Sequence, residues 1–247
     1  MANIGIHFND DGQLTPEDRD RNEDIINMVW NILSNQAGDS NREKYDAVSK
    51  LMRGWTSIHT TNGDYRGVPY FTPKAYEKYQ QLWEENNHKL TQFSAVLGKH
   101  FTHEHILPVA AAVRLFNANN QITEELVREV LYNQVNAAVV TTDEAKLLDK
   151  SQFKEKMPES FYETGNIFER YRAVNLSLLY VVWSEGNKEI VGEPKPVNLQ
   201  KDVLDNHIEH AMQDFIETAR TNILEFLDKG TAELESRIKA KKGKKDE

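Results

Sequence analysis

Apolar residues recur at three- and four-residue steps through most of this chain, and this spacing constrains the fold more than any other feature. In the first such segment the stripe consists of Ile25, Ile26, Val29, Trp30, Ile32 and Leu33. It follows Thr15 and Pro16, an N-cap residue and a proline suited to the first helical position. The pattern therefore predicts a helix that continues to about residue 36 and packs one face in a core.

The same combination of cap and stripe recurs along the chain. It predicts further helices at about residues 41–55, 72–98, 102–117, 122–140, 142–153 and 159–185. Thr72 and Pro73 repeat the cap and proline pair, and Pro108 falls in the first turns of its helix. We expect an all-α fold, with seven or eight helices in an orthogonal or irregular bundle.

The C-terminal part of the sequence predicts a change of organisation. Residues 1–185 are expected to form a helical domain, and the Gly- and Pro-rich stretch 186–198 a linker with a brief strand at Ile190 and Val191. Residues 199–240 are predicted to form one long helix, because an apolar stripe persists from Leu204 to Ile238. The lysine-rich tail 241–247 is expected to be disordered.

Composition limits the function classes. The net charge of -9 disfavours a protein that clamps nucleic acid over its whole surface. The chain contains no cysteine, which excludes disulfides, thiolate nucleophiles and cysteine-ligated metals.

The N-terminus lacks a signal-peptide pattern, and the longest apolar run, Val174 to Trp183, is too short for a membrane span. We therefore expect a soluble, cytoplasmic protein with no membrane partner.

Nucleotide and serine-hydrolase motifs are absent. The sequence contains neither a GxGxxG nor a GxxxxGK[ST] loop, and no GxSxG elbow. A di-metal bundle needs two Glu-x-x-His motifs, whereas only Glu85 and His88 supply one. No organic cofactor is expected, and a divalent metal is the one cofactor left open.

Histidines form the most chemical pattern in the chain. His100, His103 and His105 fall within six residues, and His207 and His210 stand three apart. Neutral imidazoles at such spacings are zinc ligands, with Glu104 or Asp205 as accompanying carboxylates. The alternative is structural, with Thr102 and His103 capping a helix and the later pair bordering a packed stripe.

The turn-rich stretch 57–71 is the predicted recognition loop. Its candidate contact residues are Tyr65, Arg66, Tyr70 and Phe71, because tyrosine gives a large apolar contact area with a polar end. Helical spacing assigns the neighbouring Tyr76, Tyr79 and Trp83 to the core instead.

Three functions remain open, and the sequence favours a non-enzymatic one. The leading hypothesis is an interaction or assembly protein that binds protein partners or further copies of itself as a homo-oligomer. The second is a metal-dependent hydrolase or lyase that uses the histidines. The third is nucleic-acid association through the lysine-rich tail, which would weaken steeply with salt and be lost when residues 239–247 are removed.

Overall fold

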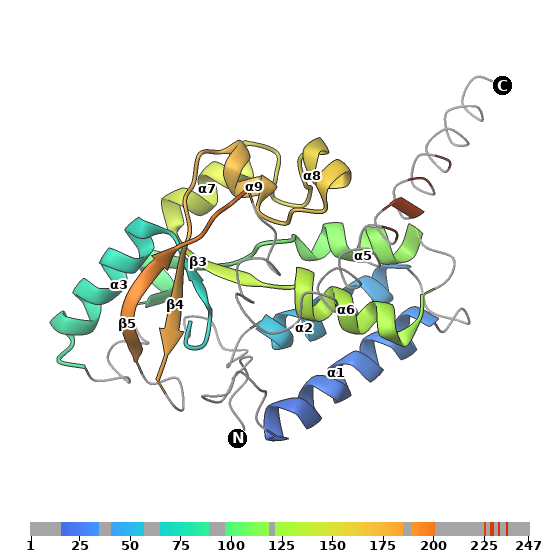
Figure 1. Ribbon diagram of the computed structural model, residues 1–247, viewed down its shortest axis with the longest axis horizontal. Helices are drawn as coiled ribbons and strands as arrows, with labels where there is room; N and C mark the ends of the chain where they lie inside the picture. Colours follow the sequence, from blue (N-terminus) through green and yellow to red (C-terminus); the bar gives the residue numbers. More distant parts are fainter. Residues whose placement is uncertain are drawn as a thin grey trace.

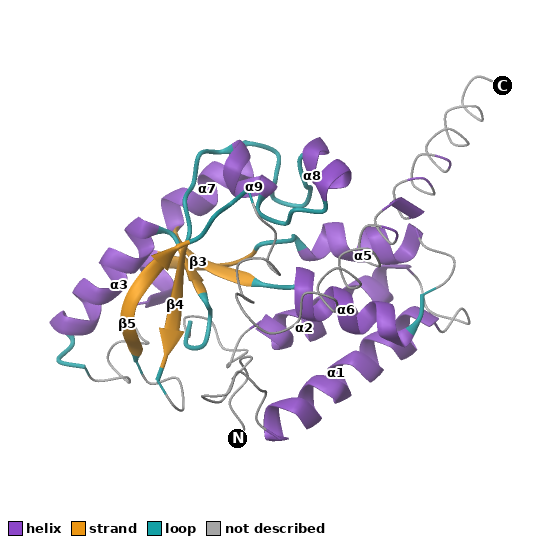
Figure 2. Cartoon of the chain, viewed as in Figure 1, coloured by secondary structure: helices purple, strands orange, loops and turns teal. Residues whose placement is uncertain are grey.

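The computed structural model contains a five-stranded mixed sheet packed against helices, so the prediction of an all-α helical bundle is wrong. It describes residues 16–34, 41–56, 65–88, 97–118, 122–184 and 189–200, with single positions between 225 and 236. The predicted long helix 199–240 and tail 241–247 lie almost wholly outside the described residues. Figures 1 and 2 show the sheet on one side and a group of helices on the other.

The sheet has the strand order β2-β3-β1-β4-β5. Its central strand β1 runs parallel to β3, and the other neighbours are antiparallel. Tyr70 of β1 lies between Ala138 of β3 and Tyr180 of β4. The strands are β1 Tyr70–Phe71, β2 Phe101–His105, β3 Ala137–Thr141, β4 Leu179–Trp183 and β5 Ile190–Pro196.

Helices cover both faces of the sheet. The N-terminal pair α1 and α2 packs with α5 and α6 on one side, and α3 packs on the other (Figure 1). The remaining helices lie beside β2 and β3 or in the segment before β4. Their bounds are α1 Pro16–Ser34, α2 Asn41–Thr56, α3 Pro73–Glu85, α5 Val109–Ala118, α6 Glu124–Gln134, α7 Thr142–Lys150, α8 Glu159–Thr164 and α9 Glu169–Ala173.

The strand alternation of β1 and β3 divides the core in two. Tyr70, Ala138 and Val140 face the cluster shared with α1, α2, α5 and α6. Phe71 and Val139 face the opposite way, toward α3. Because all of these side chains are buried, both faces of the central strands contact apolar neighbours.

Three predicted helices contain strands. The segment 102–117 begins as β2, the segment 122–140 ends as β3 after α6 stops at Gln134, and the segment 159–185 contains α8, α9 and then β4. The four residues 137–140 are buried on both faces of the sheet, so they read as a continuous apolar run rather than as an alternation. A run of this kind does not distinguish a strand from a buried helix.

Several helix starts are confirmed. The Thr72 hydroxyl accepts a hydrogen bond from the Ala75 amide at the start of α3, where Pro73 is the first helical residue. A capping box joins Thr141 and Glu144 at the start of α7. The helix predicted for 72–98 ends early, at Glu85, because Asn87 and His88 adopt left-handed backbone conformations.

The outer strand β5 is closed to further pairing along its second half. The Val197 amide donates to the Leu178 carbonyl, so Val197 faces β4. By alternation Lys195 also faces β4, whereas Pro194 and Pro196 stand at positions that face the open edge. Proline has no amide hydrogen to offer there, which protects the edge from another strand. β5 lies inside the stretch 186–198 that was predicted as a linker.

Within the described residues, no helix combines the length and the apolar character that a bilayer crossing requires.

Candidate functional site

The predicted recognition residues lie mostly in the interior. Tyr70 and Phe71 are fully buried on β1, and Tyr65 is 4% exposed. The Tyr65 hydroxyl donates to the Phe101 carbonyl over 2.7 Å, and burial raises the pKa of Tyr65 to about 12. Of the four residues only Arg66 is partly exposed, so the aromatic side chains serve the core in this chain.

Strand β2 brings two of the predicted histidines together. His103 and His105 are two residues apart, so both side chains project from the same face of the strand. Their ring centroids are 5.0 Å apart. His103 Nε2 lies 3.2 Å from the Thr56 carbonyl oxygen, and His105 Nε2 lies 3.2 Å from Thr56 Oγ1. Both rings therefore meet α2 at its last residue.

These contacts define which ring nitrogens carry protons. A carbonyl oxygen only accepts, so His103 Nε2 donates to Thr56. The Thr56 hydroxyl lies 3.3 Å from the Met52 carbonyl and donates there, which makes it the acceptor for His105 Nε2. The two histidines thus satisfy polar groups at the C-terminal end of α2, which the helix itself leaves without partners.

Both imidazoles are held in the neutral form. Burial lowers the pKa of His103. The hydrogen bond to Thr56 raises this pKa, and the positive charge of Arg53 lowers it further. Burial also lowers the pKa of His105 well below its usual value, with further contributions from His103 and Arg53. Neutral imidazole is the form that binds metals or acts as a base.

We expect these histidines to make the stability of the fold pH-dependent. When the pH falls below about 6.5, the unfolded pKa, histidines of the unfolded chain take up protons, whereas those of the folded chain stay neutral. The free energy of unfolding therefore decreases as the pH falls, until the lowered pKa of the folded state is reached. The loss is about 1.4 kcal/mol per histidine for each pH unit in that window. Urea unfolding of metal-free protein between about pH 7.5 and about pH 5.5 measures it.

The matched variants replace the ring and keep the donor. His103→Gln or His105→Gln places an amide nitrogen near the position of Nε2 and removes the group that takes up a proton. The slope of stability against pH should therefore flatten. His100→Gln leaves both strand histidines in place and should keep the wild-type slope. A slope unchanged in all three variants would assign the pH dependence to other groups.

Glu104 belongs to a separate polar cluster with Arg170. The guanidinium of Arg170 is fully buried, and its Nη2 donates to Glu104 Oε1 over 2.7 Å. Its Nη1 donates to the His105 carbonyl over 2.6 Å and lies 3.4 Å from the Ile106 carbonyl. Burial raises the pKa of Glu104, and the charge of Arg170 opposes that shift. Through these hydrogen bonds the arginine holds the C-terminal end of β2 in place.

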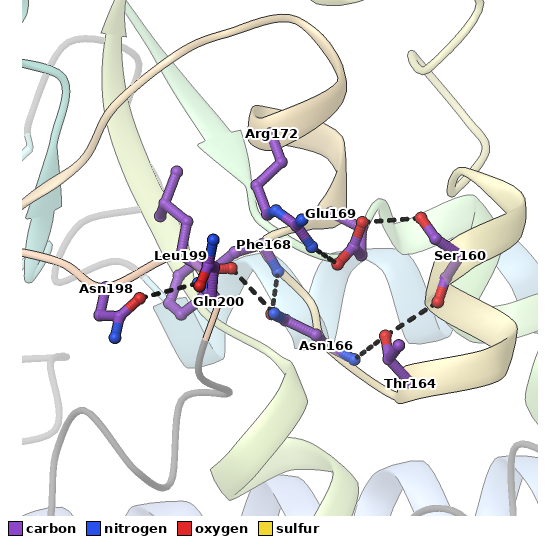
Figure 3. A network of polar contacts seen from close by, with 9 residues as sticks. All are labelled: Ser160, Thr164, Asn166, Phe168, Glu169, Arg172, Asn198, Leu199 and Gln200. Carbon is purple, nitrogen blue, oxygen red and sulfur yellow. Dashed lines mark hydrogen bonds and ion pairs between the residues drawn. The ribbon is translucent and has the colours of Figure 1, made fainter.

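A polar network holds α9, the helix that carries Arg170, in place (Figure 3). The Ser160 hydroxyl donates to Glu169 Oε2 over 2.7 Å, and Arg172 pairs with the same carboxylate. Asn166 Nδ2 donates to the Leu199 carbonyl over 2.9 Å, which ties the turn before α9 to the chain that follows β5. The position of Arg170 therefore depends on α8, on α9 and on the chain after the last strand.

The remaining predicted ligands do not join the pair. His100 lies just before β2, and its ring packs against Phe101. His207 and His210 lie outside the described residues. Among the described residues, no group of three histidine or acidic side chains lies close enough to hold a metal ion.

A second feature is an open groove of about 610 Å³ between α1 and α2. Apolar side chains from both helices line it together with polar residues: Met28, Asn31, Ile32, Glu43, Asp46, Ala47, Lys50 and Leu51. Met28 is 46% exposed, although its length and apolar character suit an interior position.

The sequence alone did not reveal Arg170 or Met28 as special. Nothing in the spacing of Arg170-Tyr171-Arg172 marks the first arginine as the buried one. Met28 falls beside the apolar stripe of α1, which sequence periodicity assigns to the core.

Comparisons with protein-family models, curated proteins and solved structures find no match.

Proposed function

We propose that this chain is an interaction or assembly protein, and that the groove between α1 and α2 is its contact surface. The supporting observation is the exposure of Met28 at a groove that Ile32, Ala47 and Leu51 also line. An exposed methionine is costly in water and adapts readily to a partner, because its unbranched side chain has several rotatable bonds.

The groove suits an amphipathic helix. Two adjacent helices with apolar side chains between them accept the apolar face of a third helix, whose residues repeat every three or four positions. Glu43 and Asp46 add negative charge to the lining of the groove, and Lys50 adds one positive charge. The occupant we propose is a helix with an apolar stripe, from a further copy of the chain or from a protein partner.

Self-association is the form of this proposal that can be tested first. We expect the mass measured by light scattering to rise with protein concentration. The net charge of -9 opposes the approach of two copies, so the association should strengthen as salt screens this repulsion. Met28→Glu replaces an apolar side chain of the groove lining with a charged one and should weaken the association at least tenfold.

Leu147→Glu is the matched control. Leu147 is 41% exposed on α7, away from the groove, so its substitution changes the same property at another place. Association that responds to Leu147→Glu and ignores Met28→Glu would move the contact surface away from the groove. A chain that is monomeric at every concentration and salt level would refute self-association.

A metal-dependent hydrolase is the second candidate, favoured by the approach of His103 and His105 on β2. A catalytic metal needs about three protein ligands and an open position for water, whose pKa the metal lowers. His100, His207 or His210 would have to supply the further ligand. Elemental analysis of protein purified without an affinity tag distinguishes the candidates, because the enzyme requires stoichiometric metal.

A further inference from the structure

We propose that His103 and His105 of β2, which lie beside Thr56 at the end of α2, form a binding site for a divalent transition-metal ion such as Zn²⁺. The proposal concerns binding alone and stands independently of the assembly function. Its basis is the approach of two imidazoles on one strand, each with its Nε2 against the same helix end.

The spacing of the two rings is that of imidazoles around one ion. Zinc binds imidazole nitrogen at about 2.0–2.1 Å. Each Nε2 lies 3.2 Å from an oxygen of Thr56, so both nitrogens point toward the same helix end. Two imidazoles bound to the same zinc ion have ring centroids about 5 Å apart, and those of His103 and His105 are 5.0 Å apart.

Binding requires only a change of tautomer. In the metal-free protein, Nε2 of each ring carries the proton that it donates to Thr56. When the ion binds at Nε2, that proton leaves and Nδ1 takes one up, so each imidazole remains neutral with one proton.

The surroundings hold the ligands in place. Pairing of β2 with β3 sets His103 opposite Val139 and His105 opposite Ala137. Arg170 fixes the His105 carbonyl from the other side. The C-terminal end of α2 carries partial negative charge, which favours a cation there. The positive charge of Arg53, which lowers the pKa of both imidazoles, also repels the cation and limits the affinity.

The site is incomplete without solvent. No third histidine or acidic side chain among the described residues lies within reach. Water would therefore complete the coordination, and the ion should exchange readily rather than remain bound through purification.

The experiment titrates zinc chloride into full-length, tag-free, chelator-treated protein by calorimetry near neutral pH. We expect one saturable ion per chain. His103→Gln and His105→Gln retain an amide donor for Thr56 and lack the imidazole, so either variant should weaken binding at least tenfold. His100→Gln and the double variant His207→Gln/His210→Gln should bind as the wild type does.

A second measurement separates coordination from a structural role and does not depend on the variants folding. Nitrogen NMR of wild-type imidazoles should show the proton on Nε2 before zinc is added and on Nδ1 afterwards, for both strand histidines. Absence of saturable binding would overturn the proposal. So would binding that survives both strand substitutions, binding that is lost only with His207 and His210, or imidazoles that keep the proton on Nε2.

Discussion

Replacing Arg170 with methionine should destabilise the protein by about 3–5 kcal/mol, because it leaves a largely buried carboxylate without its partner. The guanidinium is fully buried and serves Glu104 and the His105 carbonyl together. Methionine fills similar space but donates no hydrogen bond. Urea unfolding followed by circular dichroism measures the loss as a shift of the midpoint.

Three further variants test the cause. Arg170→Lys keeps the charge without the planar fork, so its loss should be smaller. Adding Glu104→Gln to Arg170→Met removes the uncompensated charge and should restore part of the stability. Arg128→Met is the matched control, because Arg128 pairs with Glu23 and Glu124 at the surface and should cost about 1 kcal/mol or less. If Arg170→Met lowered the free energy of unfolding no more than this control does, the Glu104–Arg170 cluster would not have the stabilising role proposed for it.

Phe71→Ala should cost about 3–5 kcal/mol, as expected when a fully buried aromatic ring is removed from a core. The ring lies on the central strand β1 and contacts Tyr76, Tyr79 and Trp183 on the α3 side of the sheet. Thermal or urea unfolding measures the loss. Phe71→Leu leaves a smaller cavity and should cost less.

This variant also decides between two roles for the residue. The sequence assigns Phe71 to a recognition surface, whereas the structure gives it no exposure. A recognition residue would lose binding and keep its stability on substitution. Arg66→Ala, at the partly exposed neighbour, is the comparison. Wild-type stability in Phe71→Ala would mean that the ring faces solvent.

Helix starts were predictable because their signals are local. Thr72, which precedes Pro73, and Thr123 accept hydrogen bonds from amides three residues further along the chain. The stripes of α1 and α2 were predictable for the same reason, since one face of each helix meets the core over several turns. Such contacts are encoded within a window of a few residues.

The sheet was not predictable because its pairing is distant. β1 consists of two residues and depends on β3, almost seventy positions further along the chain, and on β4 beyond it. The run Ala137–Val140 is buried on both faces and so lacks the alternation of an ordinary strand. Without the sheet, neither the approach of His103 to Thr56 nor the burial of Arg170 can be deduced from spacing.

The two prolines on the outer side of β5 limit how another chain can meet this edge of the sheet. A backbone edge accepts almost any extended peptide, because main-chain amides and carbonyls are the same in every sequence. Pro194 and Pro196 block that indiscriminate contact along the second half of β5, so a chain that meets this part of the edge has to contact side chains, whose shape and charge differ from one protein to the next. The benefit is protection from unselective pairing at one of the two edges of the sheet, the other being β2.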